Sequence, residues 1–331
     1  MALWNLSRNG RLAQTLGRPI GRSGYFVEQL TFLLSLLPHL VVERPDVVYV
    51  SDVVLANLLR VMARPLGYTV LFCNSGPVSP HLLHRWRHVH QTSSEHLDAA
   101  KEAGVPLERQ TLLPLGVPIA KQLVRPTRAE QLRLRKVLRV PTDGTLMLSV
   151  GAINTTRKRM DYVIREVASL PEPRPYLLLL GAREAETDGL TRLGRSLLDG
   201  GFDARSVSKE EVNDYYRAAD MFALASLDEG FGLVYAEALA HGLPCLVHDY
   251  PTARFVLSDM GIYGDLSKEG GLARMIAGLK PDDCGPDRAY ARHASVYERF
   301  SWDRLRPRYV AMFLHCAGIN RYPGEIEVGC G

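Results

Sequence analysis

The chain has 331 residues, of which 46% are hydrophobic and 23% are charged. A chain of this length exceeds the usual size of one domain, so we expect two domains of about 150 residues each. The composition is that of an ordinary folded protein, and it excludes the disordered and fibrous classes.

The formal net charge of +4 hides an uneven distribution of charge along the chain. Residues 1–140 carry 18 Lys and Arg against 9 Asp and Glu, whereas the remaining residues carry 22 against 27. A basic first part can attract phosphates, nucleic acid or an anionic membrane surface. The alternative interpretation is an arginine-rich surface that is simply solvated. Charge alone does not decide between these interpretations.

The cysteines and the apolar stretch near the start bear on the compartment. The sequence has five cysteines: Cys73, Cys245, Cys284, Cys316 and Cys330. No two of them form a CxxC pair or have the spacing of metal ligands, which favours a reducing cytoplasm. The stretch 30–42 is about a dozen residues long, below the roughly 20 of a membrane span, so we expect a core helix. In an alternative interpretation, four preceding arginines hold it peripherally on an anionic bilayer: Arg8, Arg11, Arg18 and Arg22.

From residue 46 onward, short apolar runs alternate with helical patterns, which is typical of a parallel sheet with crossover helices. The first part predicts strands at 46–51, 68–73, 88–92 and 110–115, and helices at 53–64, 80–87 and 94–103. A proline-containing segment, 117–144, surrounds a predicted helix at 128–138 and is predicted to connect two domains.

The same alternation restarts after the connection. It predicts strands at 146–150, 176–180, 221–225 and 244–248, and helices at 160–170, 188–199, 210–218, 233–240, 267–279, 287–299 and 302–316. The sequence therefore predicts an α/β fold with two Rossmann-like, doubly wound domains facing a cleft, where such sheets bind ligands. No GxGxxG after a strand, GxxxxGK[ST] or HExxH motif supports nicotinamide redox chemistry, P-loop hydrolysis or zinc proteolysis.

The segment SLDEGFGLVYAEALAHGLP, residues 226–244, is the most informative one for chemistry. Gly230 and Gly232 stand where a helix begins after a strand, and free N–H groups at a helix N-terminus attract phosphate. Glu237 is the only charged residue of the helix 233–240, so we expect it to be substantially buried. A buried carboxylate needs partners, which the two cis hydroxyls of a ribose, or alternatively an Arg or Tyr of the neighbouring layer, would provide.

Glu229 precedes this helix by a few residues and is expected to face the cleft. There it would contact a sugar hydroxyl or balance positive charge that develops at an anomeric carbon. The alternative interpretation is a solvated residue or a helix N-cap.

The spacing of Glu229 and Glu237, with GFG after the first and HGLP after the helix, resembles the donor-site motif of retaining glycosyltransferases of family 4, which have the GT-B fold. The resemblance covers most of residues 140–316. LSVGAINTTRKRMDYVI resembles the family's strand, phosphate loop and helix, and VSKEEVNDYYRAADMFALASLDEGFGL its nucleobase-to-sugar stretch. FSWDRLRPRYVAMF resembles a terminal helix that returns to the first domain, so we expect domains at 1–140 and 141–300, with that helix and a tail at 301–331.

The resemblance implies roles for individual residues. Glu237 holds the ribose, Glu229 contacts the donor sugar, and Lys158 binds phosphate and stabilises the charge of the leaving group. The other implied donor-site positions act mainly through the backbone, at the nucleobase and at the sugar or phosphate: Val207, Ser208, Gly230, Phe231, Gly232 and Leu233.

The implied activity is transfer of a sugar from a nucleoside diphosphate sugar, with UDP or GDP as the nucleotide, to a hydroxyl acceptor with retention of configuration. No metal and no cofactor besides the donor is expected, because no DxD-type pair lies in the motif region. The acceptor stays open among a sugar, a lipid-linked glycan and a small molecule, and nucleic acid is not expected. A non-catalytic nucleotide-sugar-binding partner subunit and a sugar-nucleotide epimerase are the alternatives.

The chain departs from the family pattern at three places. Ala152 stands where the family usually has an Arg, so that phosphate contact is expected to be either absent or supplied by Arg157 or Arg159. CNSGP follows the strand at 68–73 where the family often has a His, which makes Asn74, or else His81, the candidate catalytic residue. The first strand is missing before the weak match GRSGYFVEQL at 21–30, so we expect either that the true start lies upstream or that the first domain is shortened, with an incomplete acceptor side.

Five histidines lie close together in the sequence: His81, His84, His88, His90 and His96. Three of them, His81, His84 and His88, would share one face of the helix predicted at 80–87. Arg85 and Arg87 lie among them, and cations disfavour a metal ion. We therefore expect a basic solvated helix that faces an anionic or polyol acceptor, with metal binding as the alternative.

Overall fold

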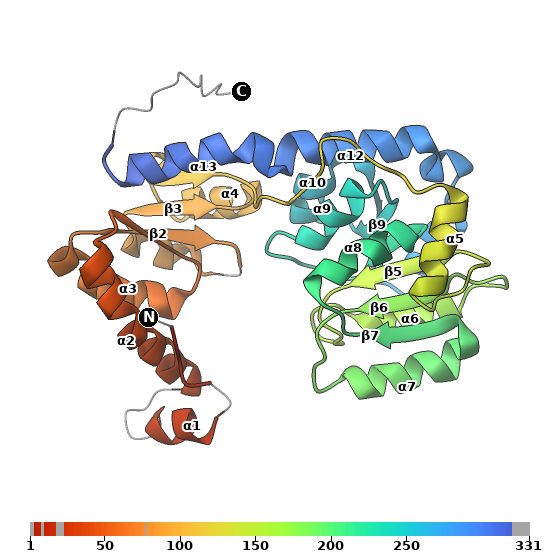
Figure 1. The fold of residues 1–331 in the computed structure, drawn as a ribbon, viewed down its shortest axis with the longest axis horizontal. Coiled ribbons are helices and arrows are strands. Elements are labelled where there is room, and N and C mark those ends of the chain that lie inside the picture. The colour runs from red at the N-terminus through yellow and green to blue at the C-terminus, as the bar shows by residue number, and fades with distance from the viewer. Residues whose placement is uncertain (1–2, 8–9, 18–22, 77, 320–331) are drawn as a thin grey trace. The chain divides into compact units, whose positions relative to one another are not determined.

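The computed structural model describes residues 3–7, 10–17, 23–76 and 78–319. The chain divides into two compact units, one formed by the residues up to Pro114 with those from Arg306 onward, and one formed by Leu115–Leu305. Each unit contains one parallel sheet that alternates with helices, so the predicted α/β fold is confirmed (Figure 1).

The first unit is built on a four-stranded parallel sheet in the order β1-β2-β3-β4. Its strands are β1 (Val47–Val50), β2 (Thr69–Asn74), β3 (His88–Gln91) and β4 (Gln110–Leu112). Its helices are α1 (Arg11–Gly17), α2 (Gly24–Glu43), α3 (Val53–Leu66), α4 (Ser94–Glu102) and the C-terminal part of α13 (Trp302–Cys316). The helix predicted at 80–87 is a 3₁₀ helix, Pro80–Arg85, and Trp86 after it is extended. His88 therefore lies on β3 and shares no helix face with His81 and His84.

Helix α2 is longer than the apolar stretch in the sequence indicates. It has 20 residues and a mean hydropathy of 1.5, so by length and composition it is long enough to cross a membrane, a test that core helices and signal sequences also pass. The prediction that this segment is too short for a span is wrong. One face contributes Leu33 and Leu40 to the core, whereas Leu34, Val41 and Val42 are exposed. Of the arginines invoked for membrane contact, Arg8, Arg18 and Arg22 lie outside the described residues, as does the side chain of Arg11.

Two buried histidines lie on β3 beneath the C-terminal part of α13. The Nε2–H of His90 donates to the carbonyl of Leu113 at 2.7 Å, and the hydroxyl of Tyr49 donates to its Nδ1 at 2.7 Å. His88 packs against His315 with ring centroids 5.4 Å apart. Burial lowers the pKa of His90 to about 4, and burial together with the charge of His315 lowers the pKa of His88 to about 4. Both rings are therefore neutral in the folded protein at neutral pH.

Acid is expected to destabilise the first unit through these two rings. An unfolded histidine has a pKa of about 6.5, so between pH 6.5 and 4 the unfolded chain binds more protons than the folded one. The free energy of unfolding should be unaffected by these groups above pH 7 and fall as the pH drops from about 6.5 to about 4, by roughly 3 kcal/mol for each ring at about 1.4 kcal/mol per pKa unit. Urea unfolding at pH 7, 5.5 and 4.5 should show a shallower decline for His90→Gln. The exposed His81→Gln is the control, and equal pH slopes in wild type and His90→Gln would contradict the assignment.

The second unit is built on a six-stranded parallel sheet in the order β10-β9-β8-β5-β6-β7. Its strands are β5 (Leu146–Val150), β6 (Tyr176–Leu180), β7 (Phe202–Arg205), β8 (Met221–Leu224), β9 (Cys245–His248) and β10 (Gly261–Gly264). Its helices are α5 (Arg128–Val137), α6 (Met160–Ala168), α7 (Thr187–Leu198), α8 (Lys209–Ala218), α9 (Leu233–Ala240), α10 (Pro251–Leu257), α11 (Gly271–Ala277), α12 (Pro286–Phe300) and the start of α13. Helix α6 packs against α7 and α11, and α9 packs against α10 and α12. Such helix layers on a parallel sheet make a doubly wound unit.

The strand order locates the position where a ligand is expected. The chain proceeds outward from β5 through β6 to β7, and then returns to the other side of β5 with β8. In open α/β sheets, ligands bind beyond the carboxyl ends of the strands at the point where the order reverses. The loops that follow β5 and β8 flank that point.

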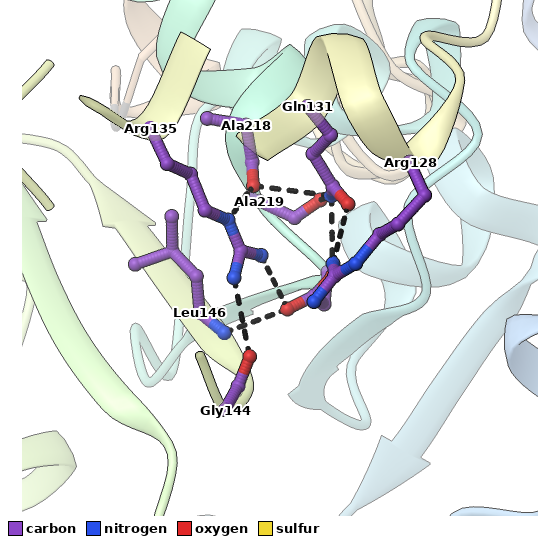
Figure 2. Close-up of polar contacts among 8 residues, drawn as sticks. Arg128, Gln131, Arg135, Gly144, Leu146, Ala218 and Ala219 are labelled. Atoms are coloured by element: carbon purple, nitrogen blue, oxygen red, sulfur yellow. Dashed lines mark hydrogen bonds and ion pairs between the residues drawn. The ribbon is translucent and has the colours of Figure 1, made fainter. Parts of the chain in front are cut away.

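The predicted connection belongs to the second unit, so the division lies earlier than the boundary expected at residue 140. The N–H of Val117 donates to the carbonyl of Phe300 at 2.8 Å. Figure 2 shows how Gln131 and Arg135 of α5 bind the carbonyl of Ala218 and the carboxylate of Asp220. Polar side chains therefore hold the connection on the second sheet, which hydrophobic periodicity does not reveal.

Candidate functional site

The loop after β5 is organised by a buried asparagine. The side-chain Oδ1 of Asn154 accepts the N–H groups of Arg157 at 3.1 Å and Lys158 at 2.9 Å, and its Nδ2 donates to Glu184 at 2.9 Å. Its carbonyl accepts the N–H of Met160, the first residue of α6, at 3.0 Å. Asn154 therefore fixes the backbone that carries Lys158. The sequence analysis missed this role, although an Asn between a strand and a helix is a known signal of local side-chain-to-backbone bonds.

The alkyl chain of Lys158 lies over the bare backbone of Gly151, the first residue after β5. A Cβ on Gly151 would lie 3.1 Å from Lys158 Cε and 3.2 Å from its Cδ, so a larger residue would push the lysine away. A glycine at this position therefore allows Lys158 to reach the end of the strand.

The loop after β8 leads through Glu229 into the N-terminus of α9. Gly232 adopts a φ of 77°, and a Cβ there would lie 2.5 Å from the ring of Tyr235, so only glycine fits. Phe231 turns its ring into the core against Phe300, at a centroid distance of 5.6 Å. Within the part of the chain that the structure describes, the N–H groups of Gly230, Phe231 and Gly232 have no acceptor. These amides, at a helix start without an acidic residue in its first turn, are available to an anion.

Lys158 and Glu229 form an ion pair that joins the two loops across the point of reversal. Glu229 is only 8% exposed, and its side chain takes no part in capping α9, whose N-cap is Gly232. The structure thus brings together two of the residues selected from the sequence. In this state the ammonium compensates the charge of the nearly buried carboxylate.

Glu237 lies on α9 and is partly buried. Its carboxylate accepts a hydrogen bond from the hydroxyl of Tyr216 at 3.0 Å. Burial, reinforced by the charge of Glu237, raises the pKa of Tyr216 well above its ordinary value, so that hydroxyl keeps its proton. No ion pair to Glu237 is found among the described residues. A neutral donor leaves acceptor capacity on the carboxylate for further hydroxyl groups.

The nucleobase positions from the sequence lie after β7, at the start of α8. Ser208 caps α8: its N–H donates to the side chain of Glu211 at 2.8 Å, and its hydroxyl accepts the N–H of Glu211 at 3.3 Å. The backbone N–H of Ser208 is therefore already used. Of the two positions, Val207 keeps its backbone groups available. Leu233, the first residue of α9, is 39% exposed.

The two arginines considered as substitutes at Ala152 differ in their contacts. Arg159 donates to the carbonyls of Ala225 at 3.3 Å and Leu266 at 2.5 Å, and it is therefore a structural residue. Arg157 is exposed, and its side chain has no partner among the residues that the structure describes. Arg157 is the candidate for the phosphate contact.

The contacts of the predicted residues of the first unit lie within that unit. Asn74 is buried at the end of β2, where its Nδ2 donates to Gln91 at 2.8 Å and its carbonyl accepts the hydroxyl of Thr92 at 3.0 Å. His81 is exposed, and His84 contacts the carbonyl of Ala103 at 3.0 Å. Among the described residues, no group of three or more His, Cys, Asp or Glu side chains is arranged to hold a metal ion.

Comparison with known proteins shows a family likeness within the second unit. Residues 130–270 match the model of the family described as glycosyl transferases group 1. Among curated proteins, the chain is 29% identical over 225 residues to the D-inositol 3-phosphate glycosyltransferase of Xylanimonas cellulosilytica, covering 65% of this chain and 53% of that protein. It is 32% identical over 202 residues to the protein of the same name from Mycobacterium leprae, covering 56% of this chain and 45% of that protein. The chain thus spans about half the length of these relatives.

Solved structures show the same fold at low sequence identity. Anabaena HepE in complex with UDP and glucose superposes with a TM-score of 0.72 and 17% identity, covering 84% of this chain and 80% of that one. Sucrose-phosphate synthase from Thermosynechococcus elongatus superposes with a TM-score of 0.72 and 18% identity, covering 88% and 79%. The fold is therefore that of the GT-B proteins, with two Rossmann-like domains. Residues 130–270 are thus similar to the glycosyl transferases group 1 family.

Proposed function

We propose that the chain transfers a sugar from a nucleoside diphosphate sugar to a hydroxyl acceptor, and that the donor binds beside Lys158 and Glu229. The observation that carries this proposal is the ion pair of these two residues at the point of strand reversal, next to the free amides of Gly230, Phe231 and Gly232. A lysine ammonium and unsatisfied amides beyond the carboxyl ends of parallel strands suit a diphosphate.

Donor binding would rearrange the ion pair. Phosphate oxygens replace the carboxylate of Glu229 as the partner of Lys158, and Glu229 is then free to accept a hydroxyl of the donor sugar. When the bond from the anomeric carbon to the leaving oxygen breaks, negative charge grows on the diphosphate, and Lys158 stabilises that charge more than it stabilises the bound substrate. Lys158 and the amides provide this stabilisation without a metal ion.

Retention of configuration is part of the proposal. In the donor complex Glu229 is assigned to a hydroxyl of the donor sugar, so the proposal includes no covalent glycosyl-enzyme intermediate. We propose a front-side route, in which the acceptor attacks from the side that the diphosphate leaves. Proton NMR of the first product formed distinguishes the two outcomes, and an inverted anomer contradicts this route.

We place the reaction in the cytoplasm, with UDP or GDP as the nucleotide of the donor. The described cysteines Cys73, Cys245, Cys284 and Cys316 are unpaired, as expected in a reducing compartment. The acceptor is a sugar, a lipid-linked glycan or a small molecule, presented in solution or at an anionic membrane surface that the basic first unit would contact.

A second function, a non-catalytic nucleotide-sugar-binding subunit, is favoured by one observation. Asn74, the candidate in the first unit, is 2% exposed and its Nδ2 donates to Gln91, while its Oδ1 has no partner among the described residues, so its side chain is enclosed within this unit. This alternative predicts that the donor raises the melting temperature but that no nucleoside diphosphate is released from it. An epimerase would instead convert the donor sugar with no acceptor present.

Replacement of Glu237 by alanine is expected to abolish most of the stabilisation by nucleotides. A ligand that binds only the native state stabilises it by an amount that grows with the logarithm of its concentration over Kd, about 2.7 kcal/mol at 100-fold excess over Kd. A thermal-shift panel of nucleoside diphosphates and their sugars should therefore give a shift for wild type and little shift for Glu237→Ala. The matched control is Glu298→Ala, which removes a carboxylate that is 57% exposed. A full shift in folded Glu237→Ala would remove Glu237 from the site.

A further inference from the structure

A hollow in the first unit is lined by arginines and lies where β2 and β3 begin. Its volume is about 910 Å³, and its walls come from the end of α3, the start of β2 and the turn before β3. Five of its lining residues are arginines: Arg60, Arg64, Arg85, Arg87 and Arg109. All lining residues belong to the first unit, so the hollow is distinct from the candidate donor site. It also lies at the edge where strands start, whereas ligands of such sheets bind where strands end.

None of these five arginines forms an ion pair with a carboxylate of the described residues. In the second unit, by contrast, Arg135, Arg183, Arg205 and Arg254 each contact an Asp at 2.7 Å or less. Uncompensated guanidinium groups around one hollow repel each other and create a strongly positive potential. An anionic ligand would relieve that repulsion.

Arg109 holds the turn that carries two of the other arginines. Its guanidinium donates to the carbonyls of His84 at 3.1 Å, Arg87 at 3.2 Å and Trp86. These bonds fix the backbone of residues 84–87, so Arg85 and Arg87 are exposed on a rigid turn. Arg60 and Arg64 are also exposed, one helical turn apart on α3. The four exposed cations are therefore presented by ordered backbone.

Two further features support a ligand at this hollow. Trp86, which lines it, stacks on Phe72 with centroids 4.0 Å apart, and its buried indole N–H has no acceptor among the described residues. A second hollow of about 410 Å³ shares Thr69, Arg87 and Arg109 with the first and contains one carboxylate, Glu108. Together the two hollows form a continuous surface, which we call the arginine groove.

We propose that the arginine groove binds a phosphate-bearing anion with two or more phosphate groups in reach of one another. Guanidinium groups bind phosphate through paired N–H donors, and four of them on a fixed backbone can engage neighbouring phosphates at once. The phosphates belong either to a soluble oligophosphate or to the headgroups of an anionic lipid surface, which Val61, 68% exposed in the same hollow, would also contact.

The test measures phosphate binding by the full chain with and without groove arginines. Arg60→Gln with Arg64→Gln removes two charges from the exposed face of α3, and Arg85→Gln with Arg87→Gln provides an independent pair. Arg192→Gln with Arg195→Gln removes two charges from exposed positions of α7 in the second unit and is the matched control. One probe is inorganic triphosphate, titrated calorimetrically into the protein in 100 mM salt. The same titration with Lys158→Ala excludes binding of triphosphate at the candidate donor site. The other probe is co-sedimentation with vesicles of phosphatidylglycerol in phosphatidylcholine, against phosphatidylcholine alone.

The proposal expects either groove pair to weaken binding at least tenfold and the control pair to change it less than twofold. Triphosphate binding identifies a soluble oligophosphate as the source, and binding to anionic vesicles alone identifies lipid headgroups. The proposal is overturned if wild type binds neither probe, or if both groove pairs bind as tightly as the control. Thermal unfolding establishes that each variant is folded, and the α3 pair retains the Arg109 contacts of the turn even if the second pair unfolds.

Discussion

Replacing Lys158 with alanine should lower kcat for sugar transfer by about 10²- to 10³-fold, the loss typical when one preorganised group that stabilises developing charge is removed. Lys158 faces the position assigned to the diphosphate and is held there by Asn154 beneath its backbone and Gly151 beneath its side chain. Because the charge on the leaving group grows in the transition state, kcat should fall more than KM rises. The measurement is release of nucleoside diphosphate from the donor that gives the largest thermal shift.

The control variants separate this role from a structural one. Lys158→Ala also leaves Glu229, which is 8% exposed, without its cation, so unfolding curves must accompany the kinetics. Lys158→Arg keeps the charge and should recover part of kcat, whereas a merely structural lysine would change stability and leave kcat intact. Arg157→Gln is expected to raise KM for the donor with a smaller effect on kcat, because Arg157 is exposed on the same loop. A folded Lys158→Ala with kcat within twofold of wild type would contradict the proposed role.

The sequence predicts the centre of the candidate site because that centre consists of local patterns. Glu229 and the glycines around Phe231 follow a buried strand and precede a helix, so their place at the carboxyl end of β8 follows from periodicity. Lys158 follows β5 in the same way. Their contact across the sheet depends on the strand order, which the sequence does not specify, because β5 and β8 are far apart in the chain and become neighbours only through the reversal.

The partners of these residues could not be predicted, since they come from other layers or from short edge elements. Tyr216 reaches Glu237 from α8, a contact between two helices that no spacing in the chain reveals. The edge strands β7, FDAR, and β10, GIYG, lack an apolar run and were not predicted.

Replacing Asp220 with asparagine should lower the free energy of unfolding of the second unit by about 3 kcal/mol, the lower end of the range for breaking a buried ion pair. Arg135 is fully buried and contacts Asp220 at 2.6 Å, while its other N–H groups donate to the carbonyls of Ala218 and Gly144 at 3.0 and 3.1 Å (Figure 2). The same carboxylate accepts the N–H of Leu146, at the start of β5, at 2.7 Å. Loss of its charge leaves an enclosed guanidinium without compensation.

Replacing Asp220 and replacing Arg135 should lower the free energy of unfolding by different amounts, because the two side chains differ in exposure. Asp220 is 30% exposed, so after Arg135→Met its carboxylate can be hydrated, and the methionine adds apolar contact in place of a buried charge. Arg135→Met should therefore lower the free energy of unfolding less than Asp220→Asn does. The double variant should be more stable than Asp220→Asn alone. Arg128→Gln is the control, since Arg128 is 56% exposed and lies 4.0 Å from the same carboxylate, a geometry worth at most about 0.5 kcal/mol.

Urea unfolding of the full chain, with native-state hydrogen exchange of the α5 and β5 amides, measures these differences. The contacts of Asp220 lie where β5 and β8 begin, whereas Lys158 and Glu229 follow the ends of the same strands. Folded Asp220→Asn should therefore keep the nucleotide thermal shift while α5 exchanges faster. An Arg135→Met chain less stable than Asp220→Asn would show that the arginine acts mainly by packing, and that the attachment of α5 does not depend on the charge of Asp220.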